Sequence, residues 1–162
     1  MKRTVVFIGF LAFAVLLQLL IAGLSTQSVP INLLFVLTLT WGYFRGWKEG
    51  LVVGFISGLT KDFFFFPVIG IHAFSFLLVG LVAGEIRPRI YQQNVLFFAL
   101  TAAPLYLLNA FIVSTFTAVV SQLSFGQTFM AVVYPDLIWT TVACCVVFIS
   151  IALLRPQLNA AP

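Results

Sequence analysis

Charged residues are the scarcest class in this sequence. Only 7% of the 162 residues are Asp, Glu, Lys or Arg, whereas 62% are hydrophobic. A water-soluble domain carries about 25% charged residues, and so small a charged fraction cannot cover a folded surface in water. The composition therefore excludes soluble enzymes, nucleic-acid-binding modules and secreted scaffolds. It also excludes intrinsic disorder, which requires low hydrophobicity and high net charge.

Cysteine and histidine are rarer still, and this limits the possible chemistry. The chain has two cysteines and one histidine. Cys144 and Cys145 are neighbours, and consecutive helical side chains point about 100° apart, so we expect neither a disulfide nor a shared metal site. His72 and a few separated acids are too few for a metal site of ordinary ligand number. The sequence therefore predicts no metal and no cofactor.

Long apolar runs are what the sequence has instead. They are continuous rather than alternating with a period of two, so they indicate helices and not a β-barrel. At about 20 residues per span, the length predicts one all-α integral-membrane domain over residues 1–162 with about six transmembrane helices. The predicted spans are residues 5–24, 30–44, 51–60, 71–84, 95–120 and 137–154. We expect a tight charged turn at residues 45–50 and a loop at 121–127.

The basic residues divide unevenly between the two ends of these spans. Six spans that start inside leave Lys61 alone on the outer side. The seven basic residues on the inner side are Lys2, Arg3, Arg45, Lys48, Arg87, Arg89 and Arg155. Because an excess of Lys and Arg marks the cytoplasmic side, both termini are predicted to be cytoplasmic. Arg45, Lys48, Arg87 and Arg89 then form a cytoplasmic basic rim, which can also contact anionic lipid.

Glycines recur four residues apart at Gly50, Gly54 and Gly58, and again at Gly80 and Gly84. In a membrane, small residues at this spacing let two helix backbones approach closely. The pattern predicts a helix-packing face. Internal packing is one interpretation, and a face for a partner's helix is the other.

Two aspartates stand at the outer ends of predicted spans, and ionisable residues at membrane depth suggest function. Asp62 lacks the flanking G-N-x-x-D-R pattern of lipoprotein signal peptidase, so we expect structural capping or pairing rather than intramembrane proteolysis. Asp136 follows Tyr134-Pro135 and resembles a helix N-cap. The sequence shows no evident acid–base partner for His72, and no enzyme is predicted.

Further polar residues lie in the middle of the fifth predicted span, and a phenylalanine cluster lies at the outer interface. Tyr106 and Asn109 in the fifth span are expected to bond across helices or to line a small cavity. Four phenylalanines follow Asp62 at residues 63–66. We predict that Phe64 and Phe65 contribute to a docking surface for a partner, the alternatives being that they fold inward or rest among lipid headgroups. Whether residues 63–69 dip into the membrane is left open.

The stretches GLVVGFISGLTKD (residues 50–62), GIHAF (70–74) and LLVGLVAG (77–84) resemble the central signature of the rod shape-determining protein MreD family. The resemblance covers about residues 28–90. It implies a fold similar to the substrate-binding component of energy-coupling-factor transporters.

The same resemblance implies a non-enzymatic scaffold in the bacterial inner membrane, which supports cell-wall elongation and peptidoglycan synthesis. The implied partner is an MreC-like protein, with MreB filaments, a RodA-type glycosyltransferase and a class B penicillin-binding protein nearby. The alternative is a vitamin-binding transporter component. Such a component uses an Ala-x-x-x-Ala pattern on its first span, which Gln18 interrupts between Ala14 and Ala22.

Overall fold

The structure is a computed structural model, which describes residues 2–24, 31–65, 69–86, 95–122 and 124–159. These residues form helices and no strands, so the predicted all-α class is confirmed. The helices are α1 (Lys2–Leu24), α2 (Leu33–Arg45), α3 (Trp47–Phe65), α4 (Ile71–Ile86), α5 (Val95–Ser121) and α6 (Phe125–Asn159).

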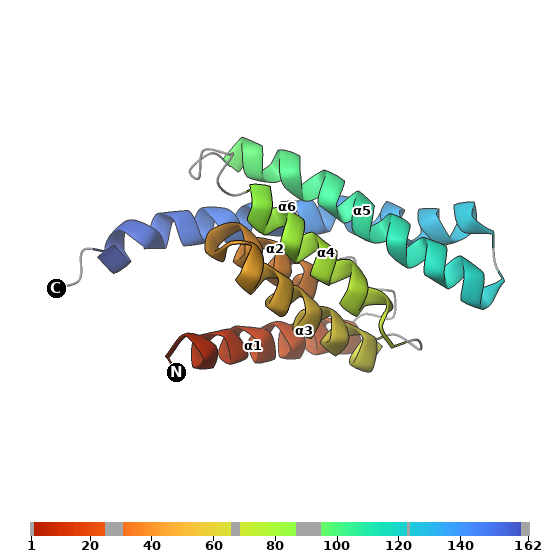
Figure 1. Ribbon diagram of the computed structural model, residues 1–162, viewed down its shortest axis with the longest axis horizontal. Helices are drawn as coiled ribbons and strands as arrows, with labels where there is room; N and C mark the ends of the chain where they lie inside the picture. The colour runs from red at the N-terminus through yellow and green to blue at the C-terminus, as the bar shows by residue number, and fades with distance from the viewer. Residues whose placement is uncertain (1, 25–30, 66–68, 87–94, 123, 160–162) are drawn as a thin grey trace.

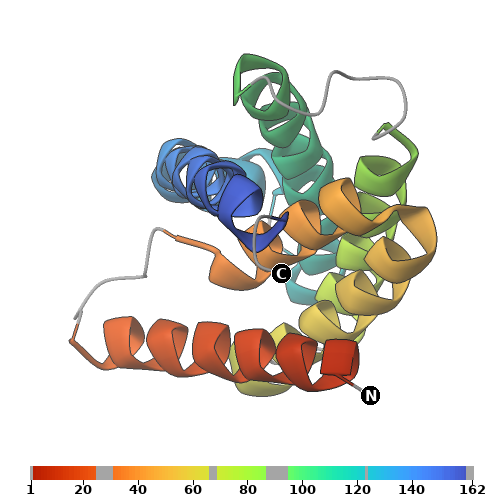
Figure 2. The same ribbon diagram turned by 90° about the vertical axis from the view of Figure 1, so that its left-hand side faces the viewer.

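The helices alternate in direction along the long axis of the molecule. Figure 1 shows that α1 begins and α6 ends at the same end of the bundle, where α2 also meets α3. The view from that end shows α2 inside the ring formed by its neighbours (Figure 2). It packs against α1, α3, α4 and α6, and this central position buries most of its side chains.

The connection between α2 and α3 is much shorter than predicted. Helix α2 ends at Arg45 and α3 begins at Trp47, so only Gly46 separates them. Gly46 has a φ of 99°, a backbone conformation that glycine adopts without a steric penalty. Its N–H donates to the Gly42 carbonyl at 2.8 Å. The prediction of a six-residue turn is wrong, because one glycine reverses the chain and Lys48 already lies in the first turn of α3.

Helix α6 also begins earlier than predicted. It starts at Phe125 rather than near Leu137, with the Thr128 N–H donating to the Ser124 carbonyl at 3.2 Å. Residues 125–135 carry no charge, and nothing in this stretch forces the helix to start later. Asp136 therefore lies inside α6, and its predicted role as an N-cap is wrong.

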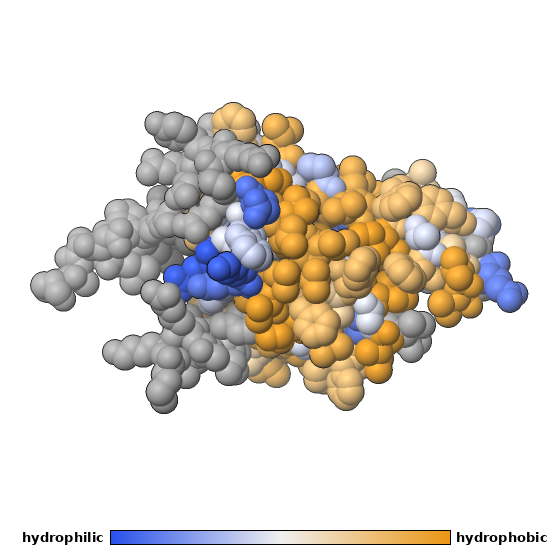
Figure 3. All heavy atoms as spheres, in the orientation of Figure 1, coloured by the Kyte–Doolittle hydropathy of each residue, from blue (hydrophilic) through white to orange (hydrophobic). Residues whose placement is uncertain are grey.

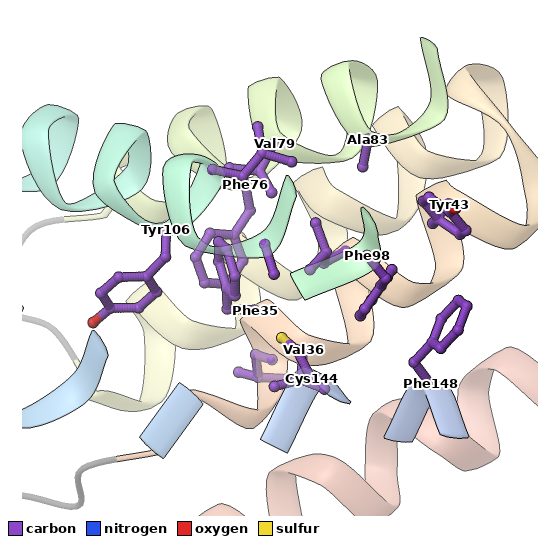
Figure 4. Packing of buried hydrophobic residues seen from close by; sticks show 14 of the residues in the cluster. Phe35, Val36, Tyr43, Phe76, Val79, Ala83, Phe98, Tyr106, Cys144 and Phe148 are labelled. Carbon is purple, nitrogen blue, oxygen red and sulfur yellow. The ribbon is translucent and has the colours of Figure 1, made fainter. Parts of the chain in front are cut away.

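Aromatic rings connect α2 to the other helices of the core (Figure 4). Phe35 is fully buried, and its ring meets that of Tyr106 on α5 edge-on at a centroid distance of 5.3 Å. Nearer the other end of α2, Tyr43 meets Phe98 of α5 edge-on at 5.1 Å. Phe98 in turn stacks on Phe148 of α6 at 4.4 Å. These contacts fix α5 and α6 against the central helix.

The exterior of the bundle is unusually apolar. Large hydrophobic side chains are exposed on every helix except the central α2, among them Phe13 (64%), Phe63 (74%), Leu100 (69%), Val119 (75%) and Ile138 (68%). Figure 3 shows apolar residues across the middle of the face in view and hydrophilic residues gathered near the α2–α3 junction. Isolated exposed hydrophobic residues are normal in water, but continuous apolar coverage is not. Lipid is the solvent that suits this surface.

Helix lengths are less uniform than six full spans would require. Within the described residues, the segment Phe97–Val120 is the one helix long and apolar enough to cross a membrane. Shorter apolar helices occupy Gly9–Leu20, Leu33–Arg45, Ile71–Ile86 and Asp136–Ser150. The six-span arrangement therefore stays a prediction.

Candidate functional site

The glycines of α3 lie directly against the backbone of α4. A Cβ atom built on each of them would collide with a carbonyl oxygen of α4, the pairs being Gly50 with Gly80, Gly54 with Phe76 and Gly58 with His72. A Cβ on Gly84 would collide with the backbone nitrogen of Trp47 at the start of α3. The two backbones are therefore in contact, with no side chain between them at these points.

All five glycines singled out by their spacing are buried in this contact. The structure brings Gly50, Gly54, Gly58, Gly80 and Gly84 together inside the chain. Their face is used within the α3–α4 hairpin, where close packing supplies the attraction that the hydrophobic effect does not provide in lipid. A partner's helix would have to contact another surface.

Asp62 caps α4 from the end of α3. Its side chain is fully buried, and its carboxylate accepts hydrogen bonds from the N–H groups of Gly70 (2.8 Å), His72 (3.0 Å) and Ala73 (3.0 Å). The first N–H groups of a helix have no partner within the helix, and a carboxylate is well suited to accept from them. The interpretation of Asp62 as a capping residue agrees with this geometry.

His72 has the partner that the sequence did not reveal. Its Nδ1 lies 2.8 Å from Oδ1 of Asp62, so the histidine has an acidic hydrogen-bond partner. The two residues meet because the chain reverses between them, with Gly70 at a φ of 109°. Since the backbone N–H groups of α4 already occupy both carboxylate oxygens, the pair serves as part of a helix cap. No group of three His, Cys, Asp or Glu side chains in the described part of the chain could hold a metal ion.

A second carboxylate lies near the first, on α6. The Tyr106 hydroxyl of α5 donates a hydrogen bond to the Asp136 carboxylate, and in Figure 4 this hydroxyl points toward α6. Lys61, the residue before Asp62, interacts electrostatically with both aspartates. Its Nζ also lies 5.7 Å from the centroid of the Phe76 ring, at cation–π distance. Lys61 therefore contacts the aromatic core of α4 and feels the charge of both aspartates.

One more polar contact completes this group. The Ser75 hydroxyl donates to Oδ1 of Asn109 at 2.8 Å, joining α4 to α5. We call the whole set the polar cluster, and its members are Lys61, Asp62, His72, Ser75, Tyr106, Asn109 and Asp136. Tyr106 and Asn109 bond across helices, as expected from the sequence. The roles of Lys61 and Ser75 are not evident from the sequence, because their neighbours come from distant segments of the chain.

The residues of the basic rim are described only in part. Arg45 is exposed and lies 3.6 Å from Glu49, measured from Nε to Oε2. Nζ of Lys48 lies 5.4 Å from the Trp47 ring centroid. Arg87 and Arg89 lie outside the described residues. Arg45 and Lys48 share the end of the molecule where α2 meets α3.

The phenylalanines after Asp62 are exposed where the structure describes them. Phe63 is 74% exposed and Phe64 is 53% exposed, and their rings meet edge-on at a centroid distance of 5.4 Å. Both belong to the last turn of α3. The side chains of Phe65 and Phe66 lie outside the described residues, as does the structure of residues 66–68. The docking role of this segment stays a prediction.

A family model described as rod shape-determining protein MreD matches residues 1–157. No match is found among curated proteins or among solved structures. The matched range includes the glycine contact, the polar cluster and the exposed phenylalanines.

Proposed function

The chain belongs to the rod shape-determining protein MreD family, and we propose that it acts as a non-enzymatic scaffold of the cell-elongation machinery in the bacterial inner membrane. Membership gives it a part in rod-shape determination. The match over residues 1–157 is the observation that carries the proposal. The apolar exterior supports a position within the bilayer.

The proposed arrangement is a single integral-membrane domain that crosses the bilayer six times, with both termini in the cytoplasm. The alternating directions of α1 to α6 (Figure 1) support this topology. The exposed Arg45 and Lys48 lie at the end of the bundle where α1 begins and α6 ends, and basic residues favour the cytoplasmic side. The partners we propose are an MreC-like protein, with MreB filaments, a RodA-type glycosyltransferase and a class B penicillin-binding protein nearby.

The short connections limit where such partners can bind. One residue separates α2 from α3, and five separate α3 from α4. Contacts must therefore be made mainly by helix faces. Because the glycine face is already used inside the α3–α4 hairpin, we propose the exposed Phe63 and Phe64 as the contact for the MreC-like protein.

The family match favours this function over a vitamin-binding transporter component, although we still propose a fold similar to that class. In such components the small residues of the first span face a transmembrane partner. Here Gln18 is 6% exposed and Ala14 packs against the core. The corresponding stripe of α1 therefore faces inward.

Replacing both Phe63 and Phe64 by serine is expected to weaken co-purification with the MreC-like protein by about tenfold or more, because two aromatic contacts are lost. The variant should remain inserted and monodisperse, since both side chains are exposed. The matched control replaces Phe10 and Phe13, an exposed pair on α1, and should bind as the unmodified chain does. Co-expression followed by affinity purification measures both. Equal recovery of the partner with either double variant would contradict this docking surface.

A further inference from the structure

The two hairpins of the bundle reach different heights at the end opposite the α2–α3 junction. The Ser75 hydroxyl of α4 donates to Asn109 of α5 at 2.8 Å, so these two residues lie at one level. From that level α4 extends only about 6 Å to its start at Ile71, whereas α5 extends about 18 Å to its end at Ser121. Figure 1 shows the turn between α5 and α6 well beyond the turn between α3 and α4. The end of α3 and the start of α4 therefore form a ledge beside the taller α5–α6 hairpin.

Only the taller hairpin is long enough to cross the hydrocarbon core of a bilayer. In the topology of the proposed function, on which this inference rests, the exposed Glu85 near the end of α4 lies at the inner boundary of the core. From Glu85, α4 rises about 21 Å to Ile71. From the same level on α5, which is about ten residues before Asn109, the helix rises about 33 Å to Ser121. Because the core is about 30 Å thick, α5 crosses it completely, whereas α4 stops roughly 10 Å short of the outer boundary.

The exposed surface of the ledge is apolar. The large side chains that are at least half exposed there are Phe63, Phe64, Ile69 and Phe74. Among the described residues of the ledge, Lys61 is the one cation, and its Nζ lies 5.7 Å from the centroid of the buried Phe76 ring. The opposite end of the same hairpin instead exposes the charged residues Lys48, Glu49 and Glu85. One end of the hairpin therefore suits the aqueous surface, and the other suits hydrocarbon.

The backbone at the ledge needs no water to satisfy its hydrogen-bonding groups. Asp62 is fully buried, and its carboxylate accepts from the N–H groups of Gly70, His72 and Ala73. The next N–H, that of Phe74, donates to the Gly70 carbonyl at 3.0 Å. In hydrocarbon an unsatisfied backbone group is costly, and a helix can begin there only where protein groups accept from its first N–H groups. Asp62 meets this requirement for α4.

We propose that the α3–α4 hairpin ends inside the hydrocarbon and that the ledge binds the acyl chains of phospholipids in the outer leaflet. The part of the α5–α6 hairpin that rises above the ledge suits the same occupant, because residues 92–135 carry no charge and Phe116 and Val119 are exposed on it. Acyl chains are flexible and apolar, so they can follow a step in the protein surface without leaving aromatic rings in water. A partner that contacts Phe63 and Phe64 must then displace lipid, and it must do so with a segment that lies within the membrane.

Tryptophan fluorescence measures the depth of the ledge and identifies what covers it. The native Trp41, Trp47 and Trp139 are replaced by phenylalanine, and a single tryptophan is introduced by F64W or, as the matched control at the α5–α6 turn, by F125W. The full chain is reconstituted into phosphatidylcholine vesicles with or without bromine at the middle of the acyl chains. Brominated lipid should quench position 64 strongly. Iodide in the water should quench position 64 about tenfold less than position 125, because a charged ion is excluded from hydrocarbon. F63W, at a side chain that is 74% exposed, gives the same reading if F64W does not fold.

Three other results would overturn the proposal, each in a different way. Iodide quenching at position 64 equal to that at position 125 would place the ledge in water and leave the six-span arrangement intact. If neither brominated lipid nor iodide quenches position 64, protein covers the ledge, for example a second copy of this chain, and acyl chains do not. Shielding of position 125 from iodide on both sides of the membrane would contradict the six-span arrangement of the proposed function, and with it the depth of the ledge.

Discussion

Replacing Gly54 by leucine is expected to prevent the chain from folding. Any Cβ at this position would collide with the backbone carbonyl of Phe76, and a backbone atom cannot rotate away as a side chain can. Ordinary overpacking costs about 1–3 kcal/mol. A leucine at this position must push apart two helices whose backbones are in contact, and this should cost several kcal/mol more. Such a cost approaches the total stability of a typical domain. The yield of monodisperse protein in detergent measures the effect.

Two other glycines provide matched controls for this change. A Cβ on Gly9 of α1 or on Gly126 of α6 would meet no atom within 4 Å. Gly9→Leu and Gly126→Leu should therefore give near-normal yields. If Gly54→Leu is as well behaved as these two, then the glycine contact does not hold the α3–α4 hairpin together.

Replacing Asp62 by alanine is expected to have the second largest effect, a destabilisation of about 3–5 kcal/mol. The change removes the acceptor for three backbone N–H groups and for the His72 ring. In a site that excludes water, these donors have no substitute partner, and each one left unpaired costs free energy. Thermal unfolding in detergent should show a clearly lowered midpoint.

A carboxylate on the same hairpin serves as the control for Asp62. Glu85 near the end of α4 is exposed, so Glu85→Ala should change stability by less than about 0.5 kcal/mol. Asp62→Asn should fall between the two, because the amide keeps one acceptor oxygen but turns its nitrogen toward N–H donors. Equal unfolding midpoints for Asp62→Ala and Glu85→Ala would show that the cap contributes little.

Features that depend on local spacing can be predicted from the sequence. The four-residue repeat of Gly50, Gly54 and Gly58 indicates a packing face, because residues four apart share one side of a helix. A capping role for Asp62 is consistent with its place just before an apolar turn. The apolar runs also place α5 and most of α1 and α4 correctly, because continuous hydrophobicity over this length specifies a helix in lipid.

Features that depend on distant segments cannot be predicted in this way. Gly46 can reverse the chain as a single residue only when its φ is positive. Glycine permits a positive φ but does not dictate it. Asp136 resembles an N-cap because Pro135 precedes it, yet α6 continues through both residues. The hydrogen bond from Ser75 to Asn109 requires two hairpins to pack together, and the residues are 34 positions apart. No spacing rule along one helix connects them.

A six-span arrangement with both termini in the cytoplasm is tested most directly by cysteine labelling. Single cysteines are placed at Lys48, Phe64 and Phe125 in a chain whose Cys144 and Cys145 are replaced by alanine. A membrane-impermeant maleimide added to spheroplasts should label position 125 alone. Position 48 should react only after permeabilisation, and position 64 should stay unreactive if, as we propose, it lies within the hydrocarbon. Labelling of position 48 from outside would contradict the topology and the scaffold built on it.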